Sequence, residues 1–301
     1  MATVAAVSTQ RSFARRGRWR RRRPAPAARA PADCGGASAL LPLSELLWSV
    51  RGASPPLTGD AELAGAFDGL RLDEVLRLRE GLPRLAAALD DGEEEMRVCY
   101  LGGSVTEQKA GYRPLVTAWL RAAAAGSCRV EEVPAFCGNC GSKVLAFMVA
   151  DWVVSRRPQL VFIELAINDG DTLLETGDAD GIGSAFEGIV RHVRDALPRS
   201  EICLLYMYVR DDLPLHLRTG SKAWADNTDA AAAATYTAAI PRLHDGVADR
   251  YGLPSIRLAP LMARLPPHLR QRAFRDDCHF LPPGAALAAA AISASLQATR
   301  A

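Results

Sequence analysis

The feature that most constrains the fold is a regular alternation of short apolar segments with helical segments between residues 96 and 298. Five short segments in which apolar residues predominate predict strands: 96–101, 128–136, 160–165, 202–208 and 254–258. Apolar residues recur at helical spacing over 112–124, 142–156, 186–197, 230–251 and 284–298, with Pro241 as a kink. Strands that are apolar throughout are typical of a parallel sheet covered on both faces. The pattern therefore predicts an α/β fold: a three-layer α/β/α domain with a doubly wound, five-stranded parallel sheet.

The chain ahead of this alternation divides in two, so that we expect one folded domain over 96–301 and two preceding segments. Residues 35–95 carry leucines at spacings of three and four, from Leu70 to Leu89, and predict a helical lead-in. Residues 1–34 form a basic extension that we expect to be disordered, because the first 32 residues hold nine arginines and no acidic residue.

Three interpretations of the basic extension remain open. The missing acids suit a mitochondrial or plastid transit peptide, and the apolar core of a secretory signal is absent. A solvated extension without a role and a nucleic-acid-binding arm around Arg20–Arg23 are the alternatives. With 36 basic and 34 acidic residues in all, the rest of the chain is net acidic, and we expect no nucleic-acid partner. The expected location is intracellular: plastid or mitochondrion if the extension is a transit peptide, and cytoplasm otherwise.

Composition and cysteine spacing narrow the classes further. Apolar residues make up 49% of the chain and charged residues 23%, which excludes a collagen-like or wholly disordered protein. No uncharged apolar run is long enough for a transmembrane segment. Seven irregularly spaced cysteines predict free thiols in a reducing compartment. Cys137-x-x-Cys140 lacks a second pair for zinc and is expected to be two loop thiols, although a bridge between them or to Cys278 would disturb neighbouring groups.

Polar residues that could take part in catalysis follow two of the predicted strands and precede the last predicted helix. Ser104 comes after Gly102-Gly103 at the end of the first strand, Asn168 follows the third, and Asp276 precedes His279 by three residues near the C-terminus. In open α/β sheets, ligands bind outside the carboxyl ends of the strands. A carboxylate can hold an imidazole in one tautomer while the other ring nitrogen acts as base for a serine. The structural alternatives are a helix N-cap at Ser104, an ordinary turn at Asn168 and a solvated loop at His279.

The order of these pieces resembles the SGNH (GDSL-type) hydrolase superfamily. The resemblance is carried by Leu101-Gly102-Gly103-Ser104-Val105-Thr106-Glu107, by Ala166-Ile167-Asn168-Asp169 and by Asp276-Asp277-Cys278-His279, and it covers most of the chain after the basic extension. Two positions depart from the pattern of the superfamily: Gly103 stands where Asp is usual, and Ala166 stands where Gly is usual.

The resemblance implies a flavodoxin-like fold and a catalytic role for each of these residues. Ser104 would be the nucleophile, His279 the general base and Asp276 its orienting partner. The oxyanion hole would use the Ser104 backbone N–H, the Asn168 side chain and a backbone N–H of the loop after the second strand. For that third donor Asn139 is the first candidate, with Gly138 and Gly141 as alternatives.

The implied activity is that of a serine esterase that hydrolyses a carboxylic ester through an acyl-enzyme on Ser104. Its substrate would be a small-molecule or glycan ester: an acetylated carbohydrate, a lipid or a small acyl ester. No metal and no organic cofactor enter this chemistry. The alternative is a catalytically inactive SGNH-fold module that binds a glycan or a protein partner.

Overall fold

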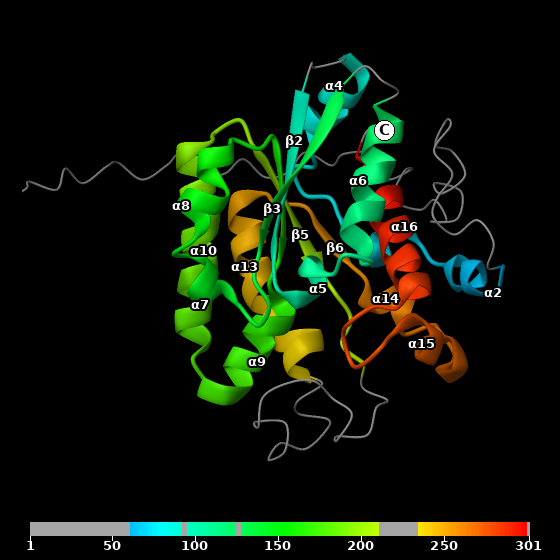
Figure 1. Ribbon diagram of the computed structural model, residues 1–301. Helices are drawn as coiled ribbons and strands as arrows, with labels where there is room; N and C mark the ends of the chain where they lie inside the picture. Colours follow the sequence, from blue (N-terminus) through cyan, green and yellow to red (C-terminus); the bar gives the residue numbers. More distant parts are fainter. Residues whose placement is uncertain (1–60, 92–94, 125–127, 211–233, 300–301) are drawn as a thin grey trace, which may run out of the picture. The chain divides into compact units, whose positions relative to one another are not determined.

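A computed structural model describes residues 61–91, 95–124, 128–210 and 234–299 of the chain (Figure 1). The predicted basic extension, its targeting role and residues 35–60 of the predicted lead-in lie outside the described residues. None of the described helices is both long enough and apolar enough to cross a membrane.

The centre of the fold is a six-stranded sheet with the order β1-β6-β5-β4-β2-β3. Five strands run parallel: β2 (Glu95–Gly102), β3 (Arg129–Phe136), β4 (Leu160–Glu164), β5 (Glu201–Tyr206) and β6 (Ser255–Arg257). They correspond to the five predicted strands. Pro134 can lie within β3 because β3 is an edge strand, where a missing N–H breaks no ladder on the open side.

The sixth strand corrects the expected count of five. β1 (Leu76–Arg77) pairs antiparallel with β6 at the other edge, through Leu76 opposite Ile256 and Arg77 opposite Ser255. A two-residue strand shows no alternation of its own, and Leu76 also fits the helical leucine spacing around it. The pairing therefore depends on a partner about 180 residues away, which the local pattern does not contain.

Two hydrophobic cores lie on the two faces of the sheet, because alternate residues of each strand point to opposite sides. In β2, Val98 and Tyr100 pack into one core, whereas Cys99 and Leu101 pack into the other. The first core is covered by α6 (Tyr112–Ala123) and α16 (Pro282–Ala298), together with α4 (Pro83–Asp91) of the lead-in. The second is covered by α10 (Ala179–Ala196) and α13 (Ile240–Tyr251), with α7 (Ser142–Leu145) and α8 (Val149–Trp152) beside α10 (Figure 1). The predicted three layers are thus present.

Several helices differ from their predicted bounds. The predicted helix 142–156 is divided into α7, α8 and the 3₁₀ turn η3 (Val154–Arg156), in a stretch rich in β-branched valines that favour helix weakly. α10 begins at Ala179, seven residues before its predicted start, where the Asp178 side chain caps it by accepting the Gly181 N–H at 2.9 Å. Pro241 lies in the first turn of α13, directly after the π-helical turn η5 (Thr235–Ala239), as expected for a kink.

The remaining short elements connect these layers. They are α2 (Ala61–Ala64), η2 (Gly65–Phe67) and α3 (Leu72–Val75) in the lead-in, and α5 (Ser104–Glu107), α9 (Ala166–Thr176), α14 (Ala259–Met262) and α15 (Pro267–Ala273) in the domain. Two of them matter for function, because α5 starts at the end of β2 and α9 starts directly after β4.

Candidate active site

The parallel register brings the ends of three neighbouring strands together. Gly102, the last residue of β2, lies opposite Phe136 at the end of β3 and opposite Glu164 at the end of β4. The segments that follow these residues, namely α5, the loop 137–142 and α9, therefore meet at one end of the strands. This is the carboxyl end of the parallel strands, where the sequence predicted the site.

Ser104 stands at the first position of α5, after a turn that requires two glycines. A Cβ atom on Gly102 would overlap Thr106, and a Cβ atom on Gly103 would overlap Oδ1 of Asn168. Gly103 thus lets the start of α9 lie directly against the turn that carries Ser104. The replacement of the usual Asp by Gly103 makes room for this contact.

Three predicted side chains form one hydrogen-bonded chain. The Ser104 Oγ lies 2.8 Å from Nε2 of His279, and Nδ1 of His279 lies 2.9 Å from each carboxylate oxygen of Asp276. With the Nδ1–H donating to Asp276, Nε2 carries a lone pair that can accept the Ser104 hydroxyl proton. Burial by itself would raise the pKa of Asp276. Hydrogen bonds from the His279 ring and from the backbone N–H groups of His279 and Cys278 outweigh burial and hold that pKa well below its usual range.

The loop that carries His279 is curved, as an Asp and a His three residues apart require. Asp276 Oδ1 accepts the backbone N–H of His279 at 2.7 Å and that of Cys278 at 3.1 Å. The turn is closed by the Arg275 N–H, which donates to the His279 carbonyl at 2.8 Å. Asp277, the neighbouring carboxylate, is buried rather than solvated, and the His279 ring bonds to Asp276 instead.

A second contact joins the His279 loop to the Ser104 segment. The Gln108 amide donates to the Phe280 carbonyl at 3.0 Å and accepts the Phe280 N–H at 3.0 Å. Gln108 directly follows α5, and Phe280 directly follows His279. Because the two bonds form a clamp between segments 172 residues apart, they set the distance between the nucleophile and the base. The sequence contains no local signal for this clamp.

Two candidate oxyanion donors belong to the Ser104 turn and to the residue packed against it, Asn168. The Ser104 N–H belongs to the first turn of a helix and has no intrahelical acceptor. Asn168 is only 7% exposed, yet among the described residues its side-chain amide donates no hydrogen bond, so it can donate to a ligand. It lies in the first turn of α9 and not in the loop that Asn-Asp-Gly suggested, since Asn and Asp near a helix N-terminus are favourable.

The loop 137–142 supplies the candidates for the third donor. Gly138 is beside the Ser104 side chain, since a Cβ built on Gly138 would lie 3.8 Å from Ser104 Cβ. Asn139 has a left-handed backbone, with φ of 59°, which an asparagine tolerates. Gly141 instead packs against the Asn168 backbone and Asp169. Of the predicted candidates, Gly138 is therefore the one that lies beside Ser104.

Asp169 fixes this loop to α9. It is fully buried and accepts the Ser142 N–H at 2.7 Å as well as the Ser142 hydroxyl, and its other neighbour is Nε2 of His244 at 2.9 Å. His244 is itself buried and stacks on Phe186. Asp169 was visible in the sequence only as the neighbour of Asn168, and its partners 27 and 75 residues away were not.

The described cysteines are free thiols, and three of them, Cys137, Cys140 and Cys278, belong to the loops around Ser104 and His279. The six cysteines at positions 99, 128, 137, 140, 203 and 278 are not in disulfides. Burial and the adjacent Cys137 sulfur raise the pKa of the Cys140 thiol to about 11. Ligand atoms of Asp276, Cys278 and His279 lie within 4.8 Å of one another and could reach one metal ion. Asp276 and His279 are, however, already hydrogen-bonded to each other in this arrangement.

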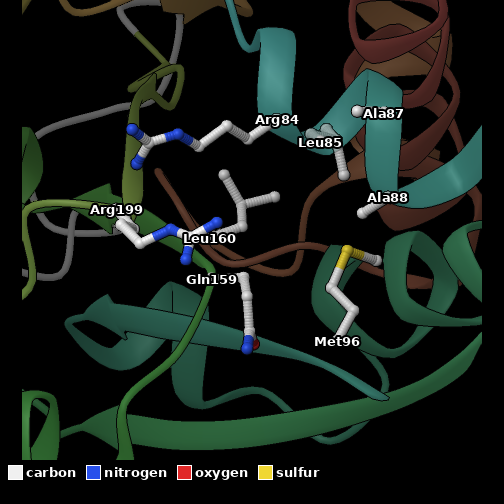
Figure 2. Close-up of a pocket in the computed structure, with 8 residues that line it drawn as sticks. All are labelled: Arg84, Leu85, Ala87, Ala88, Met96, Gln159, Leu160 and Arg199. Atoms are coloured by element: carbon white, nitrogen blue, oxygen red, sulfur yellow. The ribbon is translucent and has the colours of Figure 1, made fainter. Parts of the chain in front are cut away.

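A cavity of about 400 Å³ opens at the opposite, amino end of the parallel strands (Figure 2). It is lined by α4 residues such as Arg84 and Leu85, by Met96 near the start of β2, and by Leu160 at the start of β4. Because these are the amino ends of the strands, the cavity is separated from Ser104 by the length of the sheet.

Comparisons with known proteins give a family and a fold for the chain. Residues 100–287 match the model of the GDSL-like Lipase/Acylhydrolase family. No curated protein sequence matches the chain.

Solved structures of similar fold include three esterases or acylhydrolases. A two-domain esterase active on acetylated mannans superposes with a TM-score of 0.58 at 19% identity, over 76% of this chain and 56% of that one. A catalytic mutant of Axe2, an acetylxylan esterase from Geobacillus stearothermophilus, gives 0.52 at 14% identity, over 68% and 96% of the chains. The lipase/acylhydrolase from Enterococcus faecalis gives 0.50 at 17% identity, over 67% and 95%. The chain thus spans little more than half the length of the two-domain esterase, and at these identities the likeness establishes the fold.

Proposed function

The chain belongs to the GDSL-like lipase/acylhydrolase family, as its three motifs predicted, and from that premise we propose that it is a serine esterase with Ser104 as nucleophile. The observation that carries the proposal is the hydrogen-bonded chain from Asp276 through His279 to Ser104, with distances of 2.9 and 2.8 Å. These distances fall within the range required of a nucleophile, its base and the group that orients the base.

The proposed reaction has two halves. Ser104 Oγ attacks the ester carbonyl carbon while His279 Nε2 takes the hydroxyl proton, and the tetrahedral oxyanion is held by the Ser104 N–H, the Asn168 amide and a backbone N–H at Gly138 or Asn139. His279 then gives its proton to the departing alkoxide oxygen, which leaves an acyl-enzyme on Ser104. Water, deprotonated by His279, releases the acid by the reverse sequence. Each oxyanion donor is worth about 2.7–4 kcal/mol of transition-state stabilisation.

Acetylated carbohydrates are the proposed substrates. The support is that structures of this fold include an esterase active on acetylated mannans and an acetylxylan esterase. Lipid esters and small acyl esters are the alternatives, and a chain-length series separates them.

The test compares the parent protein with Ser104→Ala on 4-nitrophenyl esters of increasing acyl length and on acetylated manno- and xylo-oligosaccharides. We expect Ser104→Ala to fold normally and to lose about 10³-fold or more in kcat. Ser155→Ala, at an exposed serine of η3, is the matched control and should retain full activity. A fluorophosphonate should label Ser104 in the parent.

Two results would contradict the proposal. Hydrolysis that survives in Ser104→Ala, or labelling at another residue, would place the chemistry elsewhere. A parent protein that binds acetylated oligosaccharides without hydrolysing them would favour the inactive binding module.

A further inference from the structure

A buried carboxyl group lies directly beneath the Ser104 turn and has no part in the mechanism above. Glu164 is the last residue of β4, where it pairs with Gly102, and it is 1% exposed. The other four residues of β4 are apolar. A carboxyl group in such a place needs an explanation, because burying it is costly unless it is hydrogen-bonded or uncharged.

The contacts of this carboxyl group lead to the nucleophile. Oε2 accepts the Thr106 hydroxyl at 3.0 Å, and Thr106 Oγ1 in turn lies 3.0 Å from the Tyr112 hydroxyl. The backbone N–H of Gly103 faces the same carboxyl. Gly103 and Thr106 flank Ser104 on both sides, so Glu164 supports the whole turn from below. Among the described residues, Oε1 is buried and has no hydrogen-bond partner.

The surroundings favour the uncharged acid. The titratable groups that face Glu164 are Tyr112 on α6 and Asp169 on α9, and neither supplies positive charge. Burial raises the pKa of Glu164 to about 8, although the bonds from Thr106 and Gly103 act against it, and the negative charge of Asp169 adds to the rise. Burial without a positively charged partner therefore favours the protonated form of Glu164.

We propose that Glu164 is a positioning residue, an uncharged carboxyl group that holds the Gly103–Thr106 turn and keeps negative charge away from the oxyanion side of the site. This inference rests on the proposed esterase function. Ionisation of Glu164 would place a second negative charge beside that of Asp169, next to Gly103, which Asn168 contacts. The developing oxyanion would then be opposed by a nearby like charge in a poorly solvated environment.

The decisive variant is Glu164→Gln, which keeps an acceptor for Thr106 but cannot ionise. In the parent, kcat for 4-nitrophenyl acetate should fall as the pH rises through about 8, approaching a tenfold loss for each further pH unit. In Glu164→Gln this alkaline decline should disappear, with KM little changed. Glu201→Gln is the matched control, because Glu201 is a partly buried strand carboxyl with a raised pKa at the amino end of β5, far from Ser104. It should keep the alkaline profile of the parent.

A second variant tests positioning separately from charge. Glu164→Leu removes the acceptor for Thr106, and kcat should fall about 10- to 100-fold, since a shift of about 1 Å in a reacting group costs that much. Glu164→Gln should recover most of this loss. Equal losses in Glu164→Leu and Glu164→Gln would overturn the positioning role, and an alkaline decline that is the same in the parent and in Glu164→Gln would overturn the role of charge.

An unfolding measurement keeps this inference separable from the proposed function. Because the pKa of Glu164 is raised on folding, its contribution to stability is present at low pH and is lost as the pH rises from about 4.5 to about 8. Relative to Glu164→Gln, the unfolding equilibrium constant of the parent should rise by up to about tenfold per pH unit across that window. If this result is obtained and Ser104→Ala remains active, the esterase mechanism fails while the buried acid stands. If the two proteins keep a constant stability difference, the buried neutral acid itself is refuted.

Discussion

Replacing Asp276 by asparagine tests whether the His279 tautomer controls the reaction. Asp276 Oδ1 accepts two backbone N–H groups, at 2.7 and 3.1 Å, so the asparagine oxygen should keep that position. The amide nitrogen then takes the place of Oδ2, 2.9 Å from His279 Nδ1, and donates where a carboxylate accepted. The oxygen at Oδ1 also stays 2.9 Å from Nδ1, but the amide N–H beside it opposes a second N–H there. The His279 tautomer with its proton on Nε2 is therefore favoured, and in that tautomer the nitrogen facing Ser104 cannot accept the hydroxyl proton.

The expected loss follows from that wrong tautomer. We expect kcat to fall by about 10³- to 10⁴-fold with little change in KM, because the base is disabled while the substrate contacts remain. The loss should still fall short of that in His279→Ala. Stability should respond in a defined direction as well. The pKa of Asp276 is lowered on folding, so the stability it provides is present above pH 3.8 and is lost as the pH falls below that value.

The assay is steady-state hydrolysis of 4-nitrophenyl acetate at pH 7, together with urea unfolding between pH 2.5 and 6. Asp277→Asn is the control, since Asp277 is the adjacent carboxylate and does not hold the His279 ring. Nearly unchanged kcat in Asp276→Asn would refute the tautomer argument. A larger loss in Asp277→Asn than in Asp276→Asn would show that the wrong carboxylate has been assigned to His279.

Three further predictions concern the supports of the site. Gln108→Ala removes both bonds to Phe280, worth about 1–3 kcal/mol together. It should lower kcat about 10- to 100-fold, which is more than the loss of overall stability would explain, and an unchanged kcat would show that the clamp is dispensable. Gly103→Ala puts a methyl group where the Asn168 amide lies, so kcat should fall at least tenfold while fluorophosphonate still labels the serine; full activity would contradict the close contact. The Cys140 N–H donates to the Cys137 carbonyl at 3.2 Å, and this turn brings the Cα atoms of Cys137 and Cys140 within the range of a disulfide. Glutathione disulfide should therefore oxidise the two thiols to a disulfide, release two reduced glutathione molecules and lower activity reversibly. Equal activity before and after oxidation would refute this.

The fold could be predicted where local pattern determines structure. Short runs rich in apolar residues mark the five parallel strands, and the helices between them keep one apolar side, so the two periodicities separate strands from helices. β1 could not be found in this way, because Leu76 and Arg77 become a strand only through pairing with β6. The early start of α10 was missed for a different reason, since the Asp178 cap precedes the first buried apolar residue, Ile182, by four positions.

The candidate site divides along the same line. Ser104, Asn168, Asp276 and His279 could be named because each lies in a short motif after a predicted strand or before the last helix. Their supports act across the chain: Gln108 bonds to a residue 172 positions away, and no short window contains both partners. One support did leave a local signal that was not used. An acid within the apolar run Leu-Val-Phe-Ile-Glu-Leu at 160–165 indicates a buried carboxyl group at the end of a central strand.

The register of β2 explains why these distant contacts are compatible with one another. β2 lies between β3 and β4, and its last residue, Gly102, pairs with Phe136 on one side and with Glu164 on the other. Side chains alternate between the faces of a sheet, so a slip of one residue between β2 and β4 would turn Glu164 away from Thr106 and bring the apolar Ile163 or Leu165 beneath the Ser104 turn. The same slip would shift the start of α9 and take Asn168 off Gly103. The apolar faces of β4 lock the register through the two cores, and the positions of Glu164 and Asn168 relative to Ser104 follow from that lock. The geometry of the candidate site is therefore stabilised chiefly by hydrophobic packing beneath it, and substitutions that loosen the cores on either side of β4 should disturb Ser104 before they unfold the chain.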